Sequence, residues 1–230
     1  MPSFNIVREN KRNSSFRTKS IIDRYELKIE HENLCLNGSI DIEDRAWSIG
    51  LIVGASGSGK STIAKEVFKN DYISDLAYSA NKTIIDEMPQ NKSIDEITQV
   101  FNTCGLGTAW SWLKPYEILS TGEKMRVDLA RCILEDRELF VFDEFTSVVD
   151  RNVAKIASFC VSKAIKKSNK KFVAVSCHRD VIEWLEPDWI YDTDKQQFFF
   201  AQINTKDPKS KFQFSKHLEN TGRFLENITI

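Results

Sequence analysis

The segment Gly54-Ala55-Ser56-Gly57-Ser58-Gly59-Lys60-Ser61 decides the fold that this sequence predicts. It fits the pattern GxxxxGK[ST], directly after the apolar run 48–53 (SIGLIV) and directly before a helical pattern at 61–68. Because glycines allow a tight turn, successive N–H groups can point inward at phosphate, and the helix adds the positive end of its dipole. This context predicts a phosphate-binding loop and argues against a Gly/Ser-rich turn that binds nothing.

Three polar residues at the end of this loop carry the predicted chemistry. Lys60 is expected to neutralise the β- and γ-phosphates of a nucleotide, and the hydroxyl of Ser61 to ligate Mg²⁺. Thr62 follows them on the helix and is counted with the nucleotide-binding residues.

Size and composition place the chain among globular proteins. It has 230 residues, of which 41% are apolar and 28% charged, so disorder, a fibre and a small secreted scaffold are excluded. Lys and Arg number 32 against 33 for Asp and Glu, a net charge of -1. This balance gives no support to broad electrostatic attraction to nucleic acid or acidic membranes, although a local patch stays open.

The compartment predicted from the sequence is the cytoplasm. The five cysteines are scattered and form no CxxC pair, so neither a zinc cluster nor a disulfide framework is expected. The first twenty residues lack the apolar core of a signal peptide. The longest apolar runs, such as 139–142 and 198–201, are far below the ~20 residues that span a bilayer. Any membrane association is therefore expected through a partner.

The pattern along the chain predicts an α/β fold with a parallel sheet covered on both faces. Residues 14–47 read as short strands and turns, with a turn at Asn37-Gly38. Further strands are expected at 82–88, 139–142 and 172–176, and helices at 94–102, 122–135 and 152–166. The last helix is expected to bury a stripe made of Val153, Ile156, Ala157, Cys160 and Ile165.

Two acids end the apolar run 139–142 (LFVF). A parallel strand would deliver them to the carboxyl edge of the sheet, where doubly wound folds keep their ligands. Asp143 is predicted to hold Mg²⁺ through water, and Glu144 to act as general base on the water that attacks the γ-phosphate. By itself a strand that ends in Asp-Glu is a nonspecific signal. It indicates a catalytic pair only when a phosphate loop precedes it in the sequence.

The segment Ser120-Thr121-Gly122-Glu123 stands before the helical pattern that leads into the acidic strand. It reads as a capping box, S-x-x-E, in which the serine and the glutamate satisfy N–H groups at the helix start. The same place offers a second anion site, because Ser120 and the N–H groups around Gly122 lie at a helix N-terminus. The two interpretations are compatible.

The order of these motifs resembles the ATP-binding cassette (ABC) ATPases, whose signature LSGGQ precedes a helix and then the strand bearing Asp-Glu. Here the corresponding run is LSTGE at 119–123. The resemblance implies that Ser120, Thr121, Gly122 and Glu123 face the γ-phosphate held by the other subunit of a dimer. The chain departs from the family at Thr121, which replaces a glycine, and at Glu123, which replaces a glutamine and adds a negative charge near ATP.

The resemblance also assigns two residues downstream of Glu144. Asp150 matches the acid of the family's D-loop, by which the two subunits sense each other, and it equally reads as the cap of a helix that starts near 152. His178 matches the switch histidine that hydrogen-bonds the γ-phosphate, a role that a neutral imidazole can fill. A surface histidine without a role is its plain alternative.

Two further assignments lie upstream of the signature. Gln90 matches the Q-loop glutamine, which touches Mg²⁺ and the attacking water. Tyr25, with Phe16 as second choice, is the candidate for the aromatic that stacks on adenine, and both also read as ordinary strand residues.

The resemblance covers roughly residues 16–195 and implies a P-loop core of ABC type. We expect an ABC-type ATPase domain over 1–203, with a small antiparallel β part at 14–50 and a shortened helical insert at 91–120, and a tail at 204–230. It implies ATP hydrolysis with Mg²⁺ and a homodimer that closes around ATP.

Three biological roles remain open. The short stretch between Gln90 and Leu119 favours the soluble ABC-type ATPases that stand alone or accompany predicted acetyltransferase domains. The client would then be an unidentified protein, such as an acetyltransferase or a nucleic-acid-modifying enzyme, with no insertion of this chain into the membrane. The alternatives are the ATP-binding subunit of a membrane transporter and, less favoured, a P-loop kinase for a small molecule.

Overall fold

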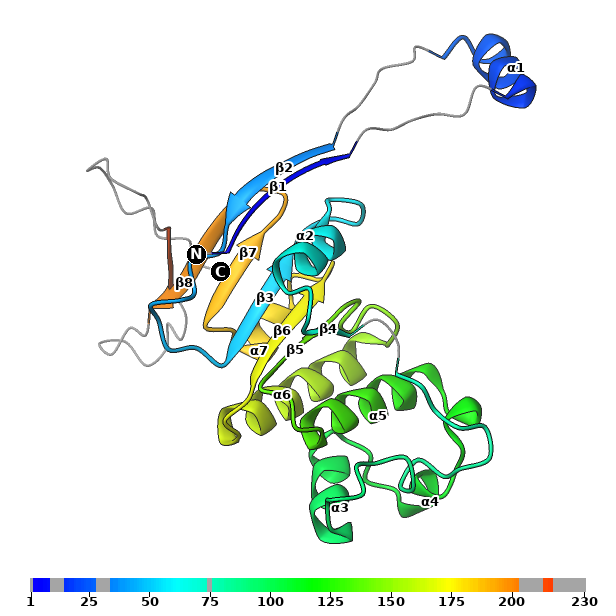
Figure 1. The fold of residues 1–230 in the computed structure, drawn as a ribbon, viewed down its shortest axis with the longest axis vertical. Coiled ribbons are helices and arrows are strands. Elements are labelled where there is room, and N and C mark those ends of the chain that lie inside the picture. Colours follow the sequence, from blue (N-terminus) through cyan, green and yellow to red (C-terminus); the bar gives the residue numbers. More distant parts are fainter. Residues whose placement is uncertain (1, 9–14, 28–33, 74–75, 203–212, 217–230) are drawn as a thin grey trace.

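The computed structural model describes residues 2–8, 15–27, 34–73, 76–202 and 213–216. Within them the chain forms a seven-stranded sheet in the order β4-β5-β6-β3-β7-β8-β9 (Figure 1). Its strands are β3 (Ile49–Val53), β4 (Tyr72–Ile73), β5 (Leu139–Phe142), β6 (Lys171–Ser176), β7 (Trp189–Asp192), β8 (Gln197–Gln202) and β9 (Gln213–Lys216). The first five in this order are parallel, whereas β8 and β9 pair antiparallel. The predicted α/β fold is confirmed.

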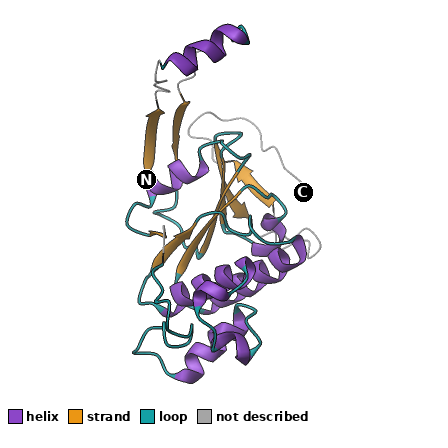
Figure 2. Cartoon of the chain, turned by 90° about the vertical axis from the view of Figure 1, so that its right-hand side faces the viewer, coloured by secondary structure: helices purple, strands orange, loops and turns teal. Residues whose placement is uncertain are grey.

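Helices cover both faces of the sheet (Figures 1 and 2). The helices after β3 are α2 (Lys60–Val67), α3 (Ile94–Thr103), α4 (Ala109–Trp112), the 3-10 helix η1 (Tyr116–Ile118), α5 (Thr121–Leu134), α6 (Arg151–Lys167) and α7 (Val181–Leu185). The helix α1 (Phe16–Arg24) lies apart from the sheet. Along β3, Leu51 joins the core shared with α3, α5 and α6, and the next residue, Ile52, joins the core shared with α2. None of the helices in the described ranges is long and apolar enough to cross a bilayer.

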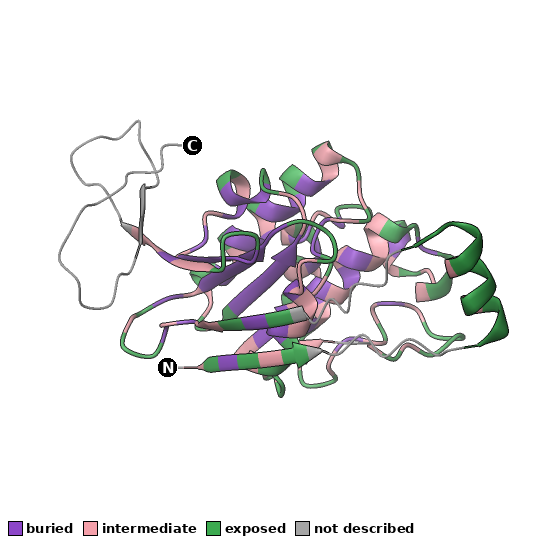
Figure 3. Ribbon diagram, turned by 90° about the horizontal axis from the view of Figure 1, so that it is seen from above, coloured by how far each residue is buried: buried purple, intermediate pink, exposed green. Residues whose placement is uncertain are grey.

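A separate two-stranded sheet, β1 (Ser3–Arg8) with β2 (Leu34–Ser39), packs beside the main one. The reading of 14–47 as short strands and turns is wrong at α1, which Ser15 caps through Thr18 N–H and whose side chains are largely exposed (Figure 3). The turn expected at Asn37-Gly38 is also wrong, because both residues lie within β2. Gly38 is needed there for close packing, since a Cβ would lie 2.6 Å from the Tyr191 hydroxyl.

Residues 82–88, expected to form a strand, form turns instead. Their backbone pairs with the segment before η1, through Ile84 N–H to Lys114 O (3.0 Å) and a single bridge between Thr83 and Pro115. Ile84 and Met88 are still buried in the core, which explains the apolar pattern. The strand that pairs with β5 on this side is the two-residue β4.

The helix expected at 152–166 is present as α6, but its buried stripe is shifted from the expected one. Ala157 and Ile165 are buried as predicted, whereas Ile156 is 57% exposed. The buried face of α6 is made largely of small residues instead. It consists of Ala154, Ala157, Ser158, Val161, Ser162 and Ile165.

We predict that Gly50→Ala destabilises the fold. A Cβ at Gly50 would lie 2.0 Å from the indole of Trp189, a ring that is fully buried between neighbours and cannot withdraw. Overpacking of this kind costs about 1–3 kcal/mol, and urea unfolding measures it. Gly107→Ala is the matched control, because its nearest atom would be 3.9 Å away. Equal stability of the two variants would contradict the packing described for β3 and β7.

Candidate functional site

The predicted phosphate loop connects β3 to α2, as the sequence indicates. Gly57 and Gly59 have φ of +82° and +90°, which favours glycine at both positions. Lys60 is 8% exposed and folds back across the loop, where its ammonium donates to the carbonyl of Ala55 at 2.7 Å. A buried ammonium held above the loop backbone is placed to meet an anion.

The N-terminus of α2 differs from those of the other long helices. Among helices of eight or more residues in the described ranges, α2 alone begins without a side-chain cap; the caps of the others are Ser15, Ser93, Ser120 and Asp150. The first N–H groups of α2 therefore have no side-chain acceptor. Together with Lys60 they fit the phosphate chain of a nucleotide.

Parallel pairing brings three predicted segments to one edge of the sheet. The phosphate loop follows β3, Asp143 and Glu144 follow β5, and His178 follows β6, which lies between them. Glu144 is exposed and has φ of +50°, so the chain turns sharply as the strand ends. The half-buried His178 donates its backbone N–H to the Ser176 hydroxyl at 3.2 Å.

Tyr72, on β4, is a site residue that sequence reasoning missed. Its hydroxyl donates to one carboxylate oxygen of Asp143, and the other oxygen accepts the N–H of Glu144 at 2.8 Å. Burial, then the hydrogen bond to Asp143, raises the pKa of Tyr72 far above its ordinary value, so the phenol keeps its proton. The only sequence signal was an isolated Tyr-Ile pair, too short to read as a strand.

A cavity of about 430 Å³ lies beside Asp143 and Glu144. Its wall includes Asp128 of α5, which accepts hydrogen bonds from the hydroxyls of Tyr78 and Tyr116, each at 2.8 Å. Burial raises the pKa of Asp128, and the two tyrosine hydrogen bonds oppose that shift. This cluster joins the helical insert to the edge that carries Asp143.

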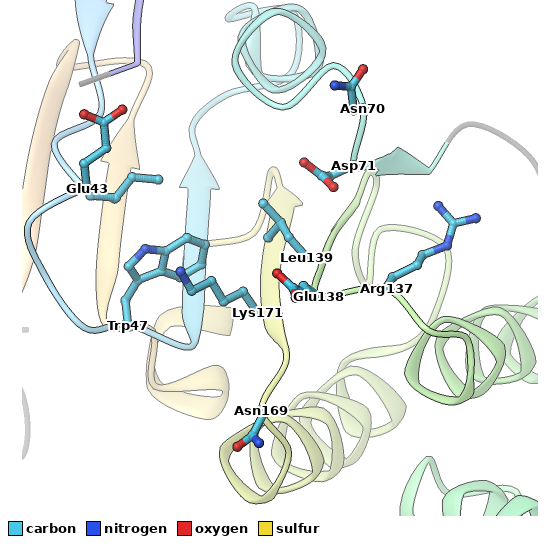
Figure 4. A pocket seen from close by; sticks show the side chains of 10 residues that line it. Glu43, Trp47, Asn70, Asp71, Arg137, Glu138, Leu139, Asn169 and Lys171 are labelled. Atoms are coloured by element: carbon cyan, nitrogen blue, oxygen red, sulfur yellow. The ribbon is translucent and has the colours of Figure 1, made fainter.

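A larger cavity, of about 670 Å³, opens at the opposite edge of the sheet, where β5 and β6 begin (Figure 4). Charges of both signs line it, including Asp71, Glu138 and Lys171, and the Lys171 ammonium lies 4.9 Å from the ring centre of Trp47. This cavity lies at the amino ends of β5 and β6, whereas the phosphate loop follows the carboxyl end of β3. The larger of the two cavities is therefore not the candidate nucleotide site.

The segment 120–123 forms the predicted capping box at the start of α5. The Ser120 hydroxyl accepts the N–H of Glu123 at 3.3 Å, and the Glu123 carboxylate accepts the N–H of Ser120 at 2.9 Å. The bonds that the N–H and the hydroxyl of Ser120 donate to the Glu123 carboxylate lower the pKa of Glu123. The added charge of Glu123 is thus engaged in the cap, and Ser111 donates to its other oxygen at 3.1 Å. Ser120 and Thr121 remain exposed.

Asp150 caps α6, accepting the N–H groups of Asn152 and Val153 at 2.9 and 3.0 Å. The plain interpretation of this residue is therefore confirmed, while its role between subunits stays a prediction. The adjacent loop packs against the start of α5, since a Cβ at Gly122 would lie 3.3 Å from Val149.

Two predicted residues are not brought to this edge. Gln90 is exposed and donates to the Asp86 carbonyl of its own loop at 3.3 Å, and the strand expected before it is absent. Tyr25 is the 65% exposed C-cap of α1, and Phe16 begins that helix; neither is a strand residue. In Figure 1, α1 lies well away from α2.

No protein-family model matches the chain. Among proteins of curated function it is similar to the macrolide export ATP-binding/permease protein MacB of Aggregatibacter actinomycetemcomitans, with 29% identity over 213 aligned residues, covering 72% of this chain and 33% of the relative. It is also similar to the lactococcin-G-processing and transport ATP-binding protein LagD of Lactococcus lactis subsp. lactis, with 23% identity covering 76% and 31%. The chain spans about a third of the length of these relatives.

Solved structures share the fold. A dimeric post-hydrolysis state of an ATP-binding cassette bound to ADP and Pi matches with a TM-score of 0.55 and 16% identity, covering 83% of this chain and 92% of that one. A bacterial Atm1-family ABC exporter with ATP bound matches with a TM-score of 0.53 and 20% identity, covering 72% and 35%.

We predict that Tyr72→Phe lowers stability, because Asp143 loses a donor within a partly buried site. The expected loss is about 1 kcal/mol in urea unfolding. Tyr191→Phe is the control, since the buried hydroxyl of Tyr191 has no hydrogen-bond partner and its removal should be neutral or stabilising. A Tyr72→Phe protein as stable as the parent would mean that the phenol does not hold Asp143.

Proposed function

We propose that this chain, which has the fold of the ATP-binding cassette ATPases, binds ATP, hydrolyses it and closes into a dimer around it. The observation that carries the proposal is the shared carboxyl edge of β3, β6 and β5. The uncapped start of α2 and the buried Lys60 follow β3 at this edge, and the Asp143–Glu144 pair follows β5 at the same edge.

ATP binding is assigned to residues 54–62. The N–H groups at the start of α2 and the ammonium of Lys60 supply the positive field for the phosphates. Mg²⁺, when bound, neutralises charge on the phosphates during transfer. The Ser61 hydroxyl and the Asp143 carboxylate would hold it, directly or through water, because hard oxygen donors suit this cation. Tyr72 and the N–H of Glu144 keep that carboxylate oriented.

Hydrolysis is assigned to Glu144 as general base. The sharp turn after β5 leaves this carboxylate exposed at the edge, where it can accept a proton from water. His178, at the end of the neighbouring strand β6, is assigned to the γ-phosphate, to which a neutral imidazole donates.

Dimer formation is assigned to the exposed start of α5. A second copy would present Ser120 and the N–H groups near Gly122 to the γ-phosphate. Because Glu123 is tied into the capping box, its charge is directed to its own helix and away from an incoming phosphate. Support also comes from the dimeric cassette that shares the fold.

The role we favour is that of the ATP-binding subunit of a membrane transporter, in place of the soluble ATPase with an unidentified client favoured by the sequence. The relatives are an export permease and a transport protein by name, and neither name mentions an acetyltransferase. The helical insert also exposes apolar side chains, with Trp110 77% exposed and Leu113 and Ile118 more than half exposed. An apolar surface of this kind fits a protein partner, and a cytoplasmic position on such a partner is our expectation.

The composite site predicts an ATP-dependent dimer. Glu144→Gln keeps size and hydrogen bonding but lacks the base, so hydrolysis should fall ~10²–10⁴-fold while binding persists. Light scattering should then find a dimer with Mg-ATP and a monomer without it. Adding Ser120→Arg should restore the monomer by blocking the second anion site.

Ser93→Arg in the Glu144→Gln protein is the matched control, because Ser93 forms the same type of capping box with Glu96 at the start of α3. This variant should still dimerise. A Glu144→Gln protein that stays monomeric at saturating ATP, or that hydrolyses ATP at the native rate, would refute the composite site.

A further inference from the structure

The turn that follows β7 lies directly against the phosphate loop. The N–H of Ala55 donates to both carboxylate oxygens of Asp194, at 2.9 and 3.1 Å, and the hydroxyls of Ser58 and Thr193 are 2.6 Å apart. A Cβ at Gly54 would lie 2.0 Å from the Thr193 hydroxyl. The first half of the loop is therefore held by the β7–β8 turn.

Arg179 connects this turn to the loop between β6 and α7 that carries His178, here called the histidine loop. One guanidinium nitrogen donates to Asp192 at 2.8 Å, and another donates to Asp192 at 3.1 Å and to Asp194 at 2.9 Å. Since Arg179 directly follows His178, a continuous chain of contacts runs from the histidine through Asp194 to Ala55. A planar fork is needed for this bridge, and a single ammonium cannot reproduce it.

Asp192 anchors the bridge. Its side chain is 4% exposed and accepts the N–H groups of Asp194 and Lys195 at 3.0 and 3.2 Å. Burial alone would raise the pKa of Asp192, but the hydrogen bonds and charge of Arg179 hold it below the ordinary value. The anchor therefore stays ionised.

Arg179 also offsets the negative charge of two carboxylates near the phosphate loop. Asp192 and Asp194 place two carboxylates beside a loop that has to attract phosphate, and Arg179 forms an ion pair with each of them. Without the guanidinium, Asp194 would leave a negative charge against Ala55, at the mouth of the loop. Such a charge opposes the binding of an anion.

We propose that Arg179 is a positioning residue that ties the histidine loop to the phosphate loop and offsets the carboxylates beside the phosphates. It acts through Asp192 and Asp194 and has no assigned contact with ATP. The inference rests on the proposed function, because it requires ATP in residues 54–62.

Calorimetric titration of the full chain with Mg-ATP measures how the charge of Arg179 affects the Kd. Arg179→Gln should bind about tenfold more weakly, a loss of about 1.4 kcal/mol. Removing the exposed charge of Asp194 as well, in Arg179→Gln/Asp194→Asn, should return the Kd to within about threefold of the parent. If Arg179 had only a structural role, the added Asp194→Asn substitution would not restore Mg-ATP binding.

Arg179→Lys tests the fork. It keeps the charge, so the Kd should stay within about threefold, but it breaks the bridge and should lower kcat about tenfold. Lys166→Gln is the control, because its ion pair with Glu186 has similar exposure, 41% and 31% against 48% and 36% for Arg179 and Asp194, away from the loop. It should leave Kd and kcat unchanged.

Three results would overturn the inference: parental Mg-ATP affinity in Arg179→Gln, no recovery in the double variant, or an equal loss in Lys166→Gln. A parent protein that does not bind Mg-ATP would overturn the proposed function, and this inference with it. Normal binding by the parent with unchanged Arg179→Gln would overturn the inference alone.

Discussion

The parallel pairing of β3 and β5 on either side of β6 is the constraint on which the rest of the site depends. Val53 pairs with Ser176, and Phe142 pairs with Ala174, so all three strands end at one edge. The middle of each strand is buried and apolar, and each strand is fixed by pairing with its neighbours. The polar residues that follow them are brought together without needing to attract one another.

At the carboxyl edge of the sheet, some residues hold the site in place and other groups remain available to a ligand. Tyr72 holds Asp143, and the β7–β8 turn with Arg179 holds the first half of the phosphate loop. The first N–H groups of α2 have no side-chain acceptor and are left for a ligand. Ser120 is exposed, but its hydroxyl is already bonded to Glu123 in the capping box of α5. An edge that is rigid around its ligand needs little reorganisation when charge develops during reaction.

Local patterns sufficed for much of this arrangement. The phosphate loop, the strands at 139–142 and 172–176 and the capping box of Ser120 could be predicted because their signals lie within a few residues. The strand β4 and the role of Tyr72 could not, because two residues carry no periodicity and their pairing with β5 is made across the fold. The same holds for residues 82–88, whose apolar side chains fill the core from turns.

The central claim, that Lys60 and the start of α2 form the phosphate site, is tested most directly by calorimetric titration of Lys60→Ala with ATP. Loss of the buried ammonium should weaken binding at least about thirtyfold, or about 2 kcal/mol. Lys69→Ala, in the exposed turn just after the same helix, should bind like the parent. Unchanged ATP binding in Lys60→Ala would place the nucleotide elsewhere and contradict the site.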